Sequence, residues 1–227
     1  MMKREDFEES LGTPLQFWSN KSQIEVRTLL GSETAGMVYY NQKNPHHCYD
    51  LFLHTLHTVR LLGVDSPITL RVAAFFHDIG KPFVAQKKQG RLVFYGHAKK
   101  SAEIAKPLII DMGYSLSEAN LICFYISHHD DFISWVLPTE SYDHGNPYLV
   151  EITQQNVANH IYEVFDNNEL PNSINTYELW ANLLKLCHAD VDAQADYVYM
   201  NSNIIDSKEK KKKKLEAINI TLNSIFS

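Results

Sequence analysis

A histidine and an aspartate stand side by side, His77 and Asp78, near the end of the apolar segment RVAAFFHDIGKPF (71–83). Burying an imidazole and a carboxylate without partners costs several kcal/mol. Neutral imidazole nitrogens and carboxylate oxygens are also the ligands of divalent metals such as manganese, iron, zinc, nickel or cobalt. The pair is therefore either satisfied locally or part of a metal site.

Further potential ligands lie in other segments with helical periodicity, and they are His54, His97, His128, His129 and Asp190. A site of two histidines and two aspartates leaves coordination positions open, as a catalytic metal needs. Adjacent His and Asp can reach one ion near a helix end, and Gly80 provides such an end without a Cβ. The Asp78 carboxylate can bridge two ions, with one oxygen for each. A metal-bound water that loses its proton near neutral pH would then be the nucleophile.

The segments that carry these residues have the apolar spacing of helices. We predict helices over 49–63, 66–80, 97–113, 115–130, 150–167, 175–196 and about 207–226. Ser66 is the expected N-cap of the second, with Pro67 at its first position, and Ser115 with Glu118 forms a capping-box pattern. Residues 83–95 form a small β-hairpin or a loop, and 131–149 form a loop. The fold class is all-α.

Composition indicates an ordinary globular chain of 227 residues, 44% hydrophobic and 21% charged. We expect one domain over 1–227, with a core at 45–200, an N-terminal extension of short helices and loop over 1–44, and a C-terminal helix at about 207–226. No apolar run is long enough to span a bilayer, and no signal peptide is visible. Three cysteines without a CxxC pattern favour a reducing, cytoplasmic location.

The order His54, His77-Asp78, Asp190 resembles the H…HD…D signature of the HD-domain metal-dependent phosphohydrolases. Four segments resemble the HD domain of bacterial tRNA nucleotidyltransferases in the same order: NPHHCYDLFLHTL, AAFFHDIGKP, FYGHAKKSAEIA and HADVDAQA. The resemblance covers roughly residues 40 to 200 and implies an HD-domain helical bundle. The polymerase domain of those enzymes has no counterpart here, so we expect a stand-alone HD domain.

The resemblance also implies residue roles. One metal would be held by His54, His77, Asp78 and Asp190. A second would be held by Asp78, His97 and one of the pair His128 and His129, with His128 slightly preferred. Lys81 would sit near a substrate phosphate, and it disfavours the subclasses that need an acidic residue there. The glycine-tyrosine-proline signature of cyclic di-GMP hydrolases is absent.

These roles imply a metal-dependent phosphohydrolase, either a phosphatase or a phosphodiesterase, with Asp78, Lys81 and His97 as catalytic residues. The expected substrate is a nucleotide or related small phosphorylated metabolite, and the expected cofactor is one or two divalent ions (Mn, Fe, Ni, Co, Zn or Mg). Two alternatives stay open: a mixed-valent di-iron oxygenase on the same fold, and a non-catalytic nucleotide-binding module.

The lysine run KEKKKKK (208–214) stands out in a chain of net charge −6. Its first interpretation is a solvated helix start, and its second is a contact to polyphosphate or nucleic acid through Lys210–Lys214. The overall negative charge disfavours a general nucleic-acid binder, since phosphate contacts need a basic face. The oligomeric state is left open.

Overall fold

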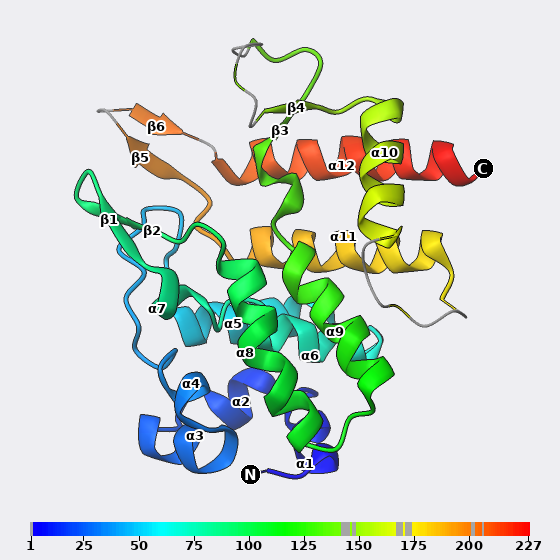
Figure 1. Cartoon of the computed structure of the whole chain (residues 1–227). Coiled ribbons are helices and arrows are strands. Elements are labelled where there is room, and N and C mark those ends of the chain that lie inside the picture. Colours follow the sequence, from blue (N-terminus) through cyan, green and yellow to red (C-terminus); the bar gives the residue numbers. More distant parts are fainter. Residues whose placement is uncertain are drawn as a thin grey trace.

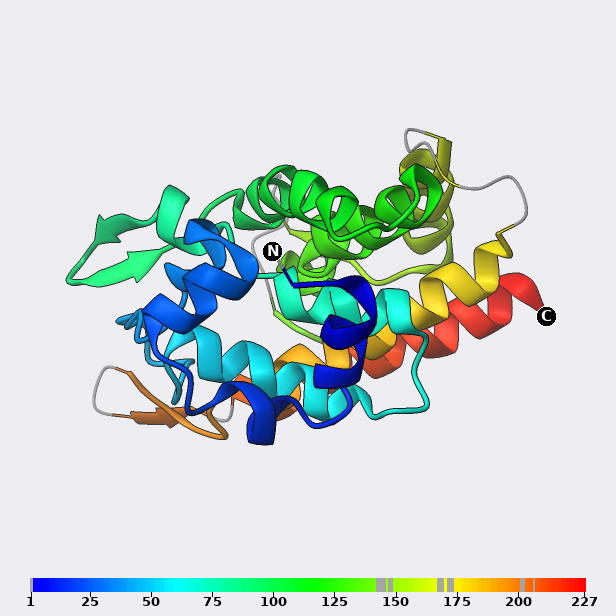
Figure 2. The same cartoon turned by 90° about the horizontal axis from the view of Figure 1, so that it is seen from below.

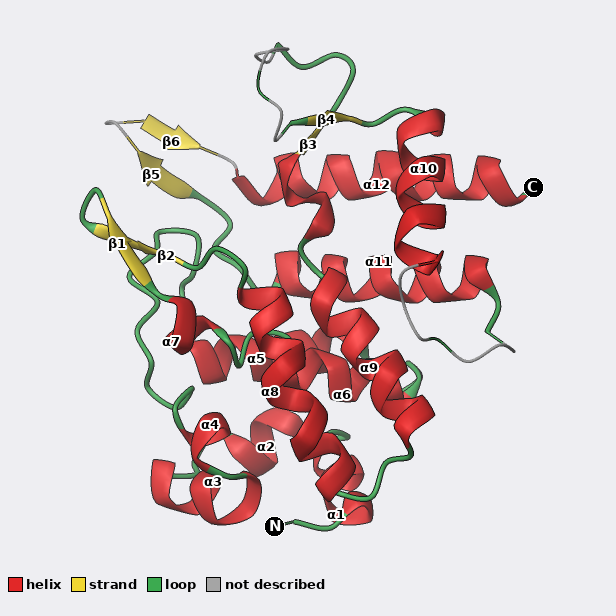
Figure 3. Ribbon diagram, in the orientation of Figure 1, coloured by secondary structure: helices red, strands yellow, loops and turns green. Residues whose placement is uncertain are grey.

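The computed structural model describes residues 2–141, 146, 149–166, 170, 174–200, 203–205 and 207–227. These residues are mainly helical, with short strands at the margins (Figure 3). The all-α fold class is confirmed.

The N-terminal part forms α1 (Arg4–Ser10), α2 (Pro14–Trp18), α3 (Gln23–Leu30) and α4 (Ser32–Ala35). These are the short helices that were expected in the N-terminal extension. Their aromatic residues pack on the helix that precedes His77: the Phe7 and Trp18 rings lie 5.1 and 5.5 Å from the Phe75 ring. The N-terminal helices, at the bottom of the view in Figure 1, therefore contribute to the hydrophobic core.

Two helices carry the first candidate ligands. In α5 (Leu51–Leu62), the Asp50 side chain accepts a hydrogen bond from the backbone N–H of Leu53, and Gly63, with φ +76°, ends the helix. α6 (Ile68–Phe76) ends just before His77, so the HDIG residues form a turn. Its N-cap is Pro67 and not the expected Ser66, whose hydroxyl donates instead to the Leu62 carbonyl. A short α7 (Lys81–Val84) follows.

The expected hairpin at 83–95 is present as β1 (Gln86–Lys88) and β2 (Arg91–Val93), an antiparallel pair. Gln89 and Gly90 between them both have positive φ, as two-residue hairpin turns require. Next come α8 (His97–Asp111), which continues through Pro107, and α9 (Leu116–His128). The capping box between Ser115 and Glu118 is present. α8 and α9 lie side by side (Figures 1 and 2).

The C-terminal part begins after the 3-10 turn Asp131–Ser134. β3 (Trp135–Val136) pairs in parallel with β4 (Val150–Glu151). β3 lies within the segment expected to be a loop, and β4 occupies the first two residues of the helix expected over 150–167. α10 (Gln154–Asp166), α11 (Thr176–Asp192) and α12 (Ser207–Phe226) follow, with the antiparallel pair β5 (Val198–Met200) and β6 (Asn203–Ile205) between the last two. α12 packs along α11, which in turn packs on α5.

One hydrophobic cluster takes in residues from Phe7 in α1 to Leu222 in α12. No helix in the described part of the chain is both long and apolar enough to cross a bilayer. The division into a 45–200 core and two extensions stays a prediction.

Candidate metal centre

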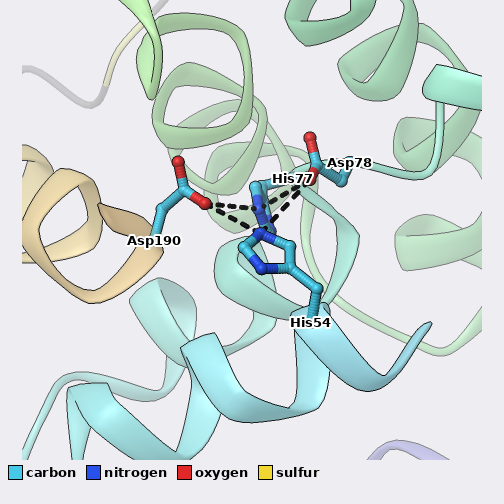
Figure 4. A group of neighbouring side chains, drawn as sticks. All are labelled: His54, His77, Asp78 and Asp190. Atoms are coloured by element: carbon cyan, nitrogen blue, oxygen red, sulfur yellow. Dashed lines mark hydrogen bonds and ion pairs between the residues drawn. The ribbon is translucent and has the colours of Figure 1, made fainter. Parts of the chain in front are cut away.

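Four of the expected ligands meet at one point, from three elements distant in sequence (Figure 4). His54 comes from α5, His77 and Asp78 from the turn after α6, and Asp190 from α11. Each offers a ligand atom within 4.8 Å of the others. His54 Nε2 lies 2.8 Å from Asp190 Oδ1, and His77 Nε2 lies 3.2 Å from Asp78 Oδ2. We call these four residues the HD group.

A second group shares Asp78 and adds His97 and His129. Asp78 Oδ2 faces His54 and His77, at 3.6 and 3.2 Å. Its other oxygen, Oδ1, lies 3.2 Å from His97 Nε2 and 3.7 Å from His129 Nε2. The carboxylate therefore presents one oxygen to each group, the arrangement of a carboxylate that bridges two ions.

Backbone carbonyls fix the orientation of all four imidazoles. Each Nδ1 atom faces a carbonyl oxygen. The distances are 3.4 Å from His54 to Ala193, 2.7 Å from His77 to Ala74, 3.0 Å from His97 to Phe94 and 2.7 Å from His129 to Ile126. A carbonyl oxygen can only accept, so each Nδ1 carries the proton. Each Nε2 then has a lone pair directed into the site, as in histidines that bind metals.

The lone pairs and carboxylate oxygens call for a cation between them. Among the described residues, His77 Nε2 and Asp78 Oδ1 are buried without a hydrogen-bond partner. The Nε2 atoms of His97 and His129 lie 3.2 Å apart, a contact that two lone pairs would make repulsive. Burial opposes a charge on His77, yet Asp78 and Asp190 raise its pKa to about 10, so these carboxylates favour a positive charge at His77 Nε2, either a proton or a metal ion in its place. The donor set thus fits a divalent metal.

Lys81 lies inside the site and away from solvent. It is only 5% exposed, and its Nζ donates to Asp78 Oδ2 at 2.6 Å and to Gln42 Oε1 at 3.1 Å. Burial would raise the pKa of Asp78, but His77 and Lys81 hold it well below its usual range. This position suits charge compensation of Asp78, and the expected contact of Lys81 with a substrate phosphate stays a prediction.

Gly80 brings the two groups together. A Cβ on it would lie 2.6 Å from the backbone nitrogen of Ser101 and 2.7 Å from the carbonyl oxygen of His97. No real side chain tolerates such contacts with backbone atoms. Gly80 also donates its N–H to the Ser101 hydroxyl. The glycine thus allows the first turn of α8, with His97, to approach the HDIG turn.

The structure places His129, and not the slightly preferred His128, beside the candidate ligands, because their rings point in different directions. His128 Nδ1 lies 2.7 Å from Asp131 Oδ2, and His160 Nε2 lies 3.0 Å from the same oxygen. We call His128, Asp131 and His160 the Asp131 cluster. Neighbouring residues of a helix point about 100° apart, so one residue of the pair faces the site and its neighbour does not. His129, 4% exposed, is the member that joins the second group.

Other histidines border the site. The His47 ring lies 5.0 Å from the His54 ring, and burial, aided by Lys81, lowers the pKa of His47 to about 2. His46 Nδ1 lies 3.0 Å from the Ser207 hydroxyl, and His57 stacks on Tyr49 with ring centroids 4.2 Å apart. Asp130 Oδ2 lies 3.6 Å from His97 Nδ1.

A small cavity of about 40 Å³ opens beside the candidate metal ligands. Its polar wall includes His129, Asp130 and Asp190, and two lysines of α12 line it as well, Lys211 and Lys214. Sequence reasoning did not assign Gln42, Gln194 or Lys211 individually to the site. Their local sequences give no signal, since only tertiary packing brings them there.

Two comparisons bear on the chain's relationships. A family model described as HD domain matches residues 46–169. The CC-adding tRNA nucleotidyltransferase of Thermus thermophilus is 33% identical over 104 residues, which are 44% of this chain and 24% of that enzyme. The chain thus spans about a quarter of that relative's length. HD domains bind divalent metals and are typically metal-dependent hydrolases. With the family model matched over more than half of its length, and with the H…HD…D residues gathered in one site, the chain belongs to the HD-domain family.

Proposed function

We propose that this chain is a metal-dependent phosphohydrolase acting on a nucleotide or a related small phosphorylated metabolite. The observation that carries the proposal is the Asp78 carboxylate, which presents one oxygen to each of two histidine groups. Metal pairs about 4 Å apart are typical of enzymes that displace a phosphoester oxygen.

The proposed roles follow the two groups. The HD group (His54, His77, Asp78 and Asp190) would hold one ion, and Asp78 with His97 and His129 would hold another. Bound divalent metal would supply an activated water and stabilise negative charge on the phosphoryl oxygens.

The chain's own residues prepare the site for that chemistry. Backbone carbonyls hold the four imidazoles with Nε2 inward, which keeps the ligands in place before substrate arrives. Lys81 neutralises part of the charge on Asp78, so the buried carboxylate stays ionised. Asp130, on the cavity wall beside His97, places a further carboxylate next to the second group.

The test is phosphate release from mono-, di- and cyclic nucleotides and sugar phosphates, with Mn²⁺, Ni²⁺, Co²⁺ or Mg²⁺. Wild type is run beside Asp78→Asn, which keeps the shape of the side chain and removes the bridging charge. We expect turnover in the wild type and a loss on the order of 10³-fold in the variant. Circular dichroism of both proteins establishes that each is folded.

No turnover from a folded, metal-loaded wild type on any of these substrates would overturn the proposal. Oxygen consumption by the iron-loaded protein would instead identify the oxygenase alternative. Nucleotide binding without turnover would identify the non-catalytic module.

A further inference from the structure

The lysine run divides into two faces of α12. On the outer face, Lys208 pairs with Asp196 at 2.6 Å, Lys210 with Glu140 at 2.7 Å and Lys212 with Asp192 at 2.9 Å. Lys213, on the same helix, lies 3.8 Å from Glu209. These contacts agree with a solvated, ion-paired helix start.

The inner face is different, because Lys211 and Lys214 line the cavity beside the candidate metal ligands. Lys214 Nζ lies 3.8 Å from Glu140 Oε2. Lys211 has no carboxylate partner among the described residues. Its Nζ donates to Gln194 Oε1 at 2.5 Å, and Gln194 Nε2 in turn donates to Asp190 Oδ2 at 3.4 Å.

The Gln194 amide therefore holds the Lys211 ammonium in position without neutralising it. Lys211 is half-buried, and burial lowers its pKa, with Asp190 acting in the opposite direction. An ammonium removed from water gains most from a hydrogen bond to an anion. An anion in the cavity would have the two lysines on one side and the metal ligands on the other.

A phosphate group suits this distribution of charge. A phosphate monoester has three non-bridging oxygens, so it can direct some toward metal ions and another toward Lys211. A phosphodiester has two, which is too few to give one oxygen to each of two ions and another to Lys211.

We propose that Lys211 binds a non-bridging oxygen of the substrate's phosphate, opposite the candidate metal ligands, and that the substrate is a phosphate monoester. This inference rests on the proposed phosphohydrolase function and narrows its substrate class. Gln194 acts as the positioning residue for Lys211.

Binding of inorganic phosphate to the Mn²⁺-loaded protein, measured by calorimetry, tests the role of Lys211. Lys211→Gln is compared with Lys211→Arg, which keeps the charge, and with Lys213→Gln, a control on the outer face. We expect Lys211→Gln to weaken phosphate binding about 10- to 100-fold, as the loss of a charged hydrogen bond predicts. The other two variants should stay within about threefold of wild type, and Mn²⁺ affinity should be unchanged in all.

Unchanged phosphate binding in Lys211→Gln would overturn the proposal, as would a wild type that binds no phosphate. A parallel loss of Mn²⁺ affinity would also overturn it, since Lys211 would then act on Asp190 through Gln194. The substrate class is tested with p-nitrophenyl phosphate and bis(p-nitrophenyl) phosphate. Faster turnover of the diester by the wild type would reject the monoester assignment.

These readouts separate this inference from the proposed function. Lys211-dependent phosphate binding in a protein that hydrolyses no substrate supports the phosphate site and overturns only the hydrolase. Turnover by the wild type that Lys211→Gln leaves unchanged in KM and kcat overturns only the inference about Lys211.

Discussion

Two clusters of histidine and aspartate lie close together in this molecule, and only one has the geometry of a metal site. In the Asp131 cluster, a carboxylate oxygen lies 2.7 and 3.0 Å from nitrogens of two imidazoles, within hydrogen-bonding distance of both. In the HD group, the imidazole protons are directed to backbone carbonyls, and the lone pairs converge on the carboxylates. The Asp131 cluster and the HD group contain the same residue types, but their imidazole lone pairs point in different directions.

The surroundings reinforce this difference. The Asp131 cluster packs against aromatic rings: the His160 ring lies 5.5 Å from both Trp135 and Trp180, and the His128 ring 4.9 Å from Phe124. It connects α9 to α10 and has the contacts of a structural element. A histidine–aspartate pair therefore indicates a metal only when something other than the aspartate accepts the histidine's proton.

The largest expected effect is on stability at Asp78. Asp78→Ala removes the partner of the buried Lys81 and should lower the free energy of unfolding by about 3–5 kcal/mol. Urea denaturation of the metal-free proteins measures it. The double variant Asp78→Ala, Lys81→Met should recover part of the loss. If the double variant is as unstable as the sum of the two single variants, charge compensation by Lys81 is refuted.

The neighbouring histidines give the most direct test of the comparison. His129→Ala should weaken Mn²⁺ binding by at least about 100-fold, because a direct ligand should matter at least as much as the residues that orient ligands. His128→Ala should change it less than about threefold, since its ring is in the Asp131 cluster. Calorimetric titration measures both affinities. Equal losses in the two variants would contradict the assignment of His129 as the ligand.

The approach of α8 to the HDIG turn is sensitive to one methyl group. Gly80→Ala should destabilise the fold by about 1–3 kcal/mol, the usual range for overpacking, because its Cβ would meet backbone atoms. Displacement of α8 by the added Cβ should move His97. It should therefore lower the occupancy of the second ion more than the occupancy of the first. Thermal melts and the Mn²⁺ stoichiometry measure these effects. Gly63→Ala, where a Cβ meets nothing within 4 Å, separates backbone strain from crowding.

The smallest effect is expected at a half-exposed ion pair far from both clusters. Arg4 donates to Glu118, and these hydrogen bonds, with those from Ser115, lower the pKa of Glu118 to about 2. A carboxyl group whose pKa is lower in the folded protein stabilises the fold at pH values above its unfolded pKa of 4.5. This contribution is lost as the pH falls from 4.5 toward 2. Screening by solvent limits it to about 0.2–1 kcal/mol. Glu118→Gln should remove this part of the pH dependence of stability, which acid unfolding of wild type and variant measures. An acid unfolding profile that the substitution leaves unchanged would contradict the assigned contribution of Glu118.

The sequence was sufficient to predict the helical fold and the capping box at Ser115, because each depends on local residue patterns. The hairpin was one of two alternatives for residues 83–95, and the second helix was expected to reach Gly80, whereas α6 ends at Phe76 and the HDIG residues form a turn. The HD group followed from an ordered set of motifs. The choice between His128 and His129 did not, because it depends on how α9 is rotated against α6 and α8. The contact of Lys81 with Gln42 could not be predicted either, because Gln42 lies 39 residues away and no local signal marks it.

The carbonyl contacts of the four imidazoles bear on how the protein acquires its metal. Since backbone carbonyls orient each ring, the fold of the chain itself sets the direction of the four Nε2 atoms. Which divalent ion occupies such a site would then be governed by the ions that a cell supplies and by their ranking for nitrogen and oxygen donors. Protein purified from different growth media should therefore carry different metals.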